Sequence, residues 1–181
     1  QIYDEHVFIF SALAIQKVFD KFDLELINLE PQTTHGGSMR YSLAKKGYYK
    51  KNDNVQKIID QELSLGLDKE ITFLKFSENI KKSKNDLVDL LKSIKKEGKT
   101  IAGYAATSKS TTILNYCGIG PDLLDYITDT TPIKQNKFSP GMHIPIVDYQ
   151  YFKDNPPDYA FLFAWNHSKE IMEKEKDFIN S

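Results

Sequence analysis

The start of the chain places an imidazole beside a phenol and a carboxylate, at His6, Tyr3 and Glu5. A neighbouring carboxylate can orient an imidazole ring and raise its basicity, so this cluster has the composition of a general base. The same residues also fit the beginning of a helix, where acidic side chains face the positive end of the helix dipole. From the residues alone both interpretations stay open, and the helix start is the more ordinary of the two.

A second cluster consists of His35, Gly36, Gly37 and Ser38. Two adjacent glycines allow a backbone to approach a ligand closely. They also make turns without any ligand, so this segment fits a binding loop and a plain turn about equally well.

The third candidate is the stretch 100–118, in which a short apolar run is followed by small and hydroxyl residues and then by apolar residues at helical spacing. This order predicts a buried strand, a tight loop and a helix. Such a helix directs its free N–H groups at one point above the sheet edge, which suits a phosphate or another anion. Lys109 adds a positive charge there. The loop is not a dinucleotide fingerprint, because the three glycine places of that motif hold Gly103, Ala105 and Ser108.

Further along, Asp129 ends the next predicted strand, near the place where a Rossmann unit carries its ribose-binding acid. This makes NAD binding a minority interpretation, since acids at strand ends are common. The loop 129–144 brings Lys134, Lys137 and His143 to the carboxyl end of the predicted sheet, where open α/β folds bind ligands. An ordinary surface loop explains these residues as well.

Two regions of the chain, which differ in their pattern of predicted strands and helices, must position these residues. Apolar residues recur every three or four positions over 6–22, which predicts an amphipathic helix. Strand candidates at 24–29 and 39–43 follow, and they can pair as a hairpin across the glycine loop. The first 46 residues therefore read as helix, strand and strand.

Two more helices are expected before the second region begins. Asp53 and Gln56 have the spacing of a capping box for a helix that ends near Gly66. A longer helix is expected over 78–97, while 67–76 is ambiguous.

From Lys99 onward strands and helices alternate, which predicts an α/β fold with a small parallel sheet and helices on both faces. The predicted strands are 100–105, 124–128, 143–147 and 159–164, and the predicted helices are 109–117, 148–153 and a last one from about 166.

The composition excludes several classes of protein. With 40 % hydrophobic residues in 181, the chain suits a packed globular protein, and its net charge of −1 provides no global field for nucleic acid or an anionic membrane. The single cysteine, Cys117, permits no internal disulfide and no cysteine-based zinc site, so no metal site is expected. No apolar run approaches the ~20 residues of a membrane span and no signal peptide is visible, so a cytoplasmic location is the default. Because it begins at Gln1 without Met, we interpret the chain as a fragment of a longer protein.

Several blocks, in order along most of the chain, resemble the C-terminal region of the nucleotide-sugar C-methyltransferases, which are S-adenosylmethionine-dependent enzymes that methylate deoxysugar carbons. These blocks are YDEHVFIFS, HGGSMR, GYAATSKSTTILNYCGI, PIKQNKFSPGMHIPI and PDYAFLFAWN. The resemblance implies a cysteine-rich zinc domain and a central methyltransferase domain that binds S-adenosylmethionine, both upstream of this sequence. Residues 1–46 would be the helix–strand–strand end of that class I methyltransferase domain, and 52–181 a Rossmann-like C-terminal domain. The isolated chain is then expected to be inactive.

The resemblance also implies roles for particular residues. Tyr3, Glu5 and His6 match the family's active-site segment, so His6 would remove a proton next to a keto group and Tyr3 would stabilise the enolate. The substrate would be a nucleotide-diphosphate sugar. His35, Gly36, Gly37 and Ser38 would line the same cleft, and Ser108, Lys109 and Asn115 would contact the sugar nucleotide. The family often has glycine where Ala105 and Ser110 stand. The alternatives are a Rossmann-like module that binds a nucleotide or a partner protein without catalysis, and a scaffold domain with an empty cleft.

Overall fold

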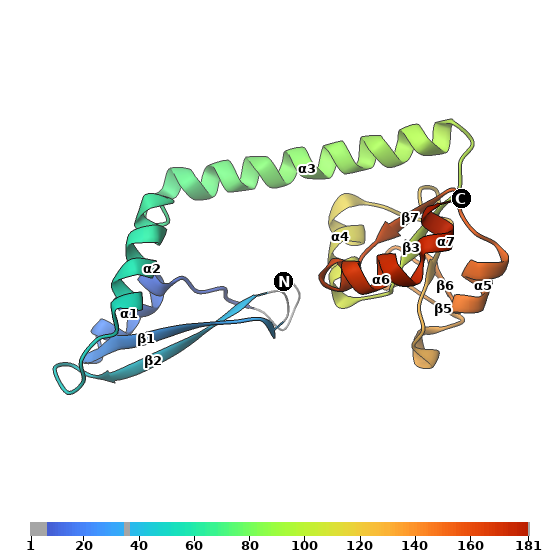
Figure 1. Cartoon of the computed structure of the whole chain (residues 1–181). Coiled ribbons are helices and arrows are strands. Elements are labelled where there is room, and N and C mark those ends of the chain that lie inside the picture. The colour runs from blue at the N-terminus through green and yellow to red at the C-terminus, as the bar shows by residue number, and fades with distance from the viewer. Residues whose placement is uncertain (1–6, 35–36, 181) are drawn as a thin grey trace. The chain divides into compact units, whose positions relative to one another are not determined.

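The computed structural model describes residues 7–34 and 37–180 of the chain. The chain folds into two compact units, and the division between them falls between Lys81 and Lys82. This boundary lies inside the long helix α3 (Glu70–Lys96), so one continuous helix belongs partly to each unit (Figure 1). The two units are described one at a time.

The first unit contains the predicted hairpin and the predicted amphipathic helix, but the helix begins at Ala12 rather than at residue 6 and ends at Asp20. Ser11 begins helix α1, because its hydroxyl oxygen accepts the Ala14 N–H at 3.1 Å. The two strands that follow pair in antiparallel fashion, with Leu26 opposite Leu43. The elements of this unit, besides the start of α3, are α1 (Ala12–Asp20), β1 (Leu24–Gln32), β2 (Ser38–Lys45) and α2 (Asp53–Ser64).

Helix α2 packs with α1 and the hairpin around one core, whose buried residues are Ala12, Ile15, Leu26, Leu29, Val55 and Ile59. The predicted capping box at its start is wrong by one residue. Asn52 is the N-cap, and its side-chain oxygen accepts the Asn54 N–H at 3.3 Å. The Gln56 amide donates instead to the Asp60 carboxylate, one helical turn further on.

The second unit contains a five-stranded sheet with the order β5-β6-β4-β3-β7. All neighbouring strands are parallel except the edge pair β5 and β6. The predicted α/β fold with a small parallel sheet is therefore confirmed, and only the short strand β5 was not expected. The strands are β3 (Ile101–Tyr104), β4 (Tyr126–Thr128), β5 (Lys137–Phe138), β6 (Pro145–Val147) and β7 (Tyr159–Leu162).

Helices cover both faces of this sheet. Leu91 of α3 and Leu114 of α4 (Ser108–Cys117) pack with Ile127 in one core. On the other face Phe152 of α5 (Tyr149–Asp154) packs with Tyr104, and Ile171 and Phe178 of the last two helices pack against them. Those helices are α6 (Ser168–Lys174) and α7 (Lys176–Ile179); short 3₁₀ turns also occur at Pro132–Lys134 and Trp165–His167.

The chain order of the strands determines which loops meet. From β3 the chain moves through β4 to β6 on one side and then returns to place β7 on the other side of β3. Since β3, β4, β6 and β7 are parallel, the loops that follow them lie at the same edge of the sheet. That edge is where open α/β folds bind their ligands.

Candidate functional site

The predicted catalytic residues Tyr3, Glu5 and His6 lie outside the described residues, as do His35 and Gly36. Of the first two sequence clusters the structure therefore places only Gly37 and Ser38. Gly37 has a φ of 125°, a conformation that favours glycine, and Ser38 opens β2 opposite Gln32. The catalytic and cleft-lining roles of these clusters remain predictions.

The chain just after His6 is anchored to the rest of the first unit. The Tyr41 hydroxyl donates to the Phe10 carbonyl at 3.0 Å. Both oxygens of the Glu62 carboxylate accept backbone N–H groups at the start of α1, from Ala12 and Leu13, each at 2.8 Å. These contacts connect positions 31 to 50 residues apart, and the local sequence pattern did not predict them.

In the second unit a cleft of about 290 Å³ lies at the carboxyl edge of the sheet. Thr107 and Ser108, at the start of α4, form one side of it. Lys134, at the end of the 3₁₀ turn after β4, and Lys137 and Phe138, which form β5, line the other. The structure thus brings the hydroxyl-rich loop of the third sequence candidate and the two lysines of the fourth together in one cleft, whereas His143 of the fourth candidate is not among the residues that line it.

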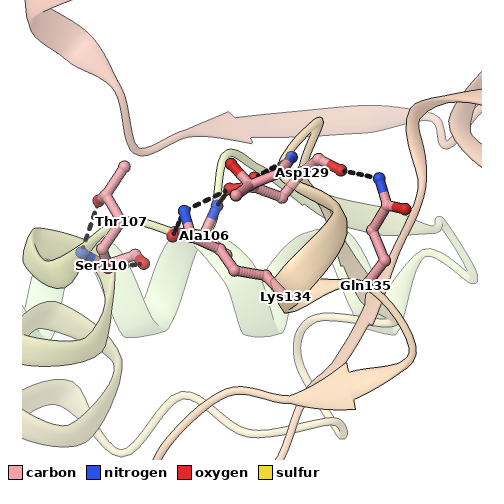
Figure 2. A network of polar contacts seen from close by, with 7 residues as sticks. Ala106, Thr107, Ser110, Asp129, Lys134 and Gln135 are labelled. Carbon is pink, nitrogen blue, oxygen red and sulfur yellow. Dashed lines mark hydrogen bonds and ion pairs between the residues drawn. The ribbon is translucent and has the colours of Figure 1, made fainter.

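Helix α4 begins at this cleft because Thr107 caps it. The Thr107 hydroxyl oxygen accepts the Ser110 N–H at 3.0 Å, and the Ser110 hydroxyl donates back to the Thr107 carbonyl at 2.6 Å (Figure 2). The helix ends at Gly118, whose φ of 69° is the left-handed conformation usual for a C-cap. The N–H groups of Ser108 and Lys109 occupy first-turn positions that have no acceptor within the helix.

Asp129 joins the two sides of the cleft from the end of β4, and only 8 % of it is exposed. One carboxylate oxygen, Oδ2, accepts the Ala106 N–H at 2.7 Å and the Lys134 ammonium at 3.1 Å (Figure 2). The other, Oδ1, accepts the Thr131 N–H at 2.8 Å. Both oxygens are engaged inside the protein, which argues against the role of a ribose-binding acid.

The charge state of Asp129 follows from this environment. Burial on its own raises the pKa of the carboxyl group, but the hydrogen bonds from Thr131, Lys134 and Ala106 outweigh it, so the pKa lies below its ordinary value. The carboxylate is therefore ionised at neutral pH and balances the charge of Lys134. Lys137, by contrast, has no ion-pair partner among the described residues, so it presents an unbalanced positive charge to the cleft.

The predicted contacts of the sugar nucleotide lie at three different places on α4. Ser108 lines the cleft. The Lys109 ammonium lies 5.4 Å from the centre of the Trp165 ring, which follows β7 on the far side of β3. Asn115 lies two turns further along, where its amide donates to the Thr111 carbonyl at 2.8 Å and the Pro140 carbonyl at 3.0 Å. Its position fits a residue that holds the cleft wall.

Two further observations limit the site. No group of three or more His, Cys, Asp or Glu side chains within 7–34 and 37–180 is placed to hold a metal ion. None of the helices in that described part is long and apolar enough to cross a membrane.

The fold and the site together define a class of protein. It is a Rossmann-like α/β domain with a cleft, lined by lysine and hydroxyl side chains, at the edge of its sheet. Residues 33–181 match the family described as the C-methyltransferase C-terminal domain, and the chain belongs to this family. It is also 30 % identical over 181 residues to the C-methyltransferase NovU of Streptomyces niveus. That alignment covers 99 % of this chain and 43 % of NovU, so the chain spans less than half the length of this relative. The resemblance inferred from the sequence blocks is confirmed.

Proposed function

We propose that this chain is the C-terminal part of an S-adenosylmethionine-dependent C-methyltransferase that acts on a nucleotide-linked keto-deoxysugar. The observation that carries the proposal is the family match over 33–181, which includes residues 82–181 of the second unit. The similarity to NovU over nearly all of this chain supports it. In the domain division that we propose, residues 1–46 close the methyltransferase domain and 52–181 form the C-terminal domain.

The boundary in this proposal differs from the division by contacts. In the structure α2 shares a core with α1 and β1, and the compact units divide at Lys81 instead.

The proposed chemistry begins with His6, which takes a proton from the sugar carbon next to the keto group. Glu5 orients the imidazole, and Tyr3 donates a hydrogen bond to the enolate oxygen that forms, where the negative charge develops. The methyl group of such a reaction comes from S-adenosylmethionine. Asp129 is satisfied internally, so we assign it no contact with the ribose of that cofactor.

The nucleotide diphosphate of the substrate would lie in the cleft of the second unit. Its phosphates would accept hydrogen bonds from the Ser108 hydroxyl and the first-turn N–H groups of α4, and Lys137 would balance their charge. Phe138, which is exposed and lines the same cleft, provides apolar surface for the nucleoside. Lys109 would reach the same ligand from the β7 side of α4.

The test uses the full-length protein with the His6→Ala variant, and His167→Ala as a control because that histidine is exposed. We expect His6→Ala to abolish methylation of a sugar nucleotide while its melting temperature and thymidine diphosphate affinity match the wild type. Activity retained in His6→Ala would remove His6 from the role of base. If the wild type binds NAD and not thymidine diphosphate, the alternative of a non-catalytic nucleotide-binding module is favoured instead.

A further inference from the structure

Ala105 has a φ of 75°, a left-handed backbone conformation that residues with a Cβ rarely adopt. It is the first residue after β3 and stands directly before the loop that begins α4. Its N–H donates to the Thr128 carbonyl at 2.9 Å, and its carbonyl accepts the Thr107 N–H at 3.2 Å. Such a conformation persists only where the surroundings enforce it.

The enforcing contacts come from Asp129 and Lys134. Asp129 Oδ2 accepts the N–H of Ala106 at 2.7 Å, and the Lys134 ammonium donates to the carbonyl of Ala106 at 2.8 Å. The ammonium also donates to the same Asp129 oxygen at 3.1 Å, which closes the arrangement (Figure 2). The peptide group after Ala105 is thus held by Asp129 through the Ala106 N–H, as the peptide group before Ala105 is held by the Thr128 carbonyl. Lys134 secures Asp129 and also holds the following peptide group through the Ala106 carbonyl.

The ion pair is itself held in place. The Asp129 carbonyl accepts the Gln135 side-chain amide at 3.0 Å (Figure 2), and Asp129 Oδ1 accepts the Thr131 N–H. The Lys134 side chain is partly exposed, whereas the Asp129 carboxylate is buried. Removing the lysine should therefore loosen the loop without leaving a large cavity, and Lys134 is the better residue to test.

From this geometry we propose that Asp129 and Lys134 are positioning residues, which hold Ala105 in its left-handed conformation and so direct the start of α4 toward the nucleotide diphosphate. The inference rests on the proposed function of the cleft. A glycine at position 105 reaches the same conformation without help but stays flexible. In this chain the Asp129–Lys134 ion pair holds the loop in its binding conformation before the ligand arrives. This lowers the conformational entropy cost of binding.

The experiment uses four forms of the full-length protein: wild type, Lys134→Met, Ala105→Gly and the double variant. Lys169→Met, an exposed lysine on α6, serves as the matched control. Hydrogen exchange of the peptide 105–112 without ligand reports whether the loop is held. Calorimetry with thymidine diphosphate reports affinity, and thermal melting reports whether each variant is folded.

We expect Lys134→Met to speed hydrogen exchange in this peptide and to weaken thymidine diphosphate binding by about fivefold, the size of one such conformational penalty. In turnover assays the KM for the sugar nucleotide rises while kcat is unchanged, because Lys134 acts on binding alone. Ala105→Gly in the Lys134→Met background restores most of the affinity, because glycine does not need the ion pair. Lys169→Met changes none of these quantities.

Three results would overturn the inference. If the affinity of Lys134→Met equals that of the wild type, the ion pair does not prepare the loop. If affinity falls but Ala105→Gly restores none of it, Lys134 contacts the ligand directly. If the wild type does not bind thymidine diphosphate although its loop is protected from exchange, the proposed nucleotide site fails, and the positioning role fails with it.

Discussion

The hydroxyl of Tyr104, the last residue of β3, donates a hydrogen bond of 2.7 Å to the buried carboxylate of Glu175, 71 residues further along the chain. The Tyr149 hydroxyl donates to the same oxygen, also at 2.7 Å. Lys153 and Lys174 lie 3.6 and 3.7 Å from the carboxylate, respectively. This cluster ties the C-terminal helices to the strand that leads directly into Ala105 and the candidate cleft.

Replacing Glu175 with Gln should destabilise the protein at neutral pH. A hydrogen bond to a buried charged group contributes about 2 kcal/mol. The uncharged amide of glutamine has one acceptor oxygen instead of two, so it accepts the tyrosine hydrogen bonds more weakly and loses the attraction to the lysines. We expect a loss of about this size in the free energy of unfolding, measured by chemical denaturation of the full-length protein. Glu173→Gln is the control, because that side chain is exposed and should change the free energy by less than about 0.5 kcal/mol. Equal effects of the two variants would contradict the prediction.

The same cluster predicts a pH dependence. Burial raises the pKa of Glu175, but the hydroxyls of Tyr149 and Tyr104 and the nearby lysines outweigh it, so the pKa is lower than the ordinary 4.5. A carboxyl group whose pKa is lower in the folded state stabilises that state above its unfolded pKa, and this stabilisation is lost as the pH falls through the folded pKa. Melting curves should therefore show the wild type approaching Glu175→Gln as the pH is lowered from 7 to 3. A difference that stays constant over this range would exclude an ionised Glu175.

Much of the fold could be predicted because it depends on local patterns. The hairpin of the first unit and the alternation of the second follow from apolar spacing and were confirmed. Helix α3 begins at Glu70, earlier than expected, because the exposed apolar residues Ile71, Leu74 and Phe76 obscure the period of its first turns. Strand β5 was not predicted because two residues are too few to show the alternation of apolar and polar side chains that marks a strand.

The candidate site could be predicted only in part. The sequence indicated that the loops around Ser108 and Lys134 share one sheet edge, since parallel strands require it. It could not show that Asp129 is satisfied internally, or that Glu62 caps α1 and Glu175 binds Tyr104, because these contacts join residues 23 to 71 positions apart. Long-range hydrogen bonds of single side chains leave no periodic signal.

Glu62 should stabilise the first unit by capping a helix to which it does not belong. Its carboxylate satisfies two N–H groups of the first turn of α1, so Glu62→Ala should cost about 1–2 kcal/mol of stability. Hydrogen exchange localised to residues 11–14 should rise in the same variant. Glu78→Ala, at an exposed position of α3, is the control and should change neither quantity. Unchanged exchange at 11–14 in Glu62→Ala would show that the cap contributes nothing.

Gly141 should tolerate no side chain, for two separable reasons. Its φ of 81° is left-handed, and a Cβ there would collide with the Asn115 amide that holds the Pro140 carbonyl. Gly98 has a similar φ of 75° but open space around it, so Gly98→Ala measures the backbone effect alone, about 1 kcal/mol. Gly141→Ala should cost a further ~1–3 kcal/mol because of the collision, as measured by denaturation. Similar losses in the two variants would mean that Asn115 moves aside freely.

The contact between Lys109 and Trp165 offers a direct test of the proposed nucleotide contact. Trp165 is the only tryptophan in the sequence, it is 52 % exposed, and the Lys109 ammonium lies over its ring. If Lys109 moves to the phosphates when a nucleotide binds, the cation leaves the indole and the tryptophan emission changes. Thymidine diphosphate should therefore change the emission of the wild type and of Lys169→Met equally, and that of Lys109→Met several-fold less. Calorimetry on the same samples checks that Lys109→Met still binds at saturating nucleotide. An equal emission change in Lys109→Met would show that Lys109 stays on the indole and does not contact the ligand.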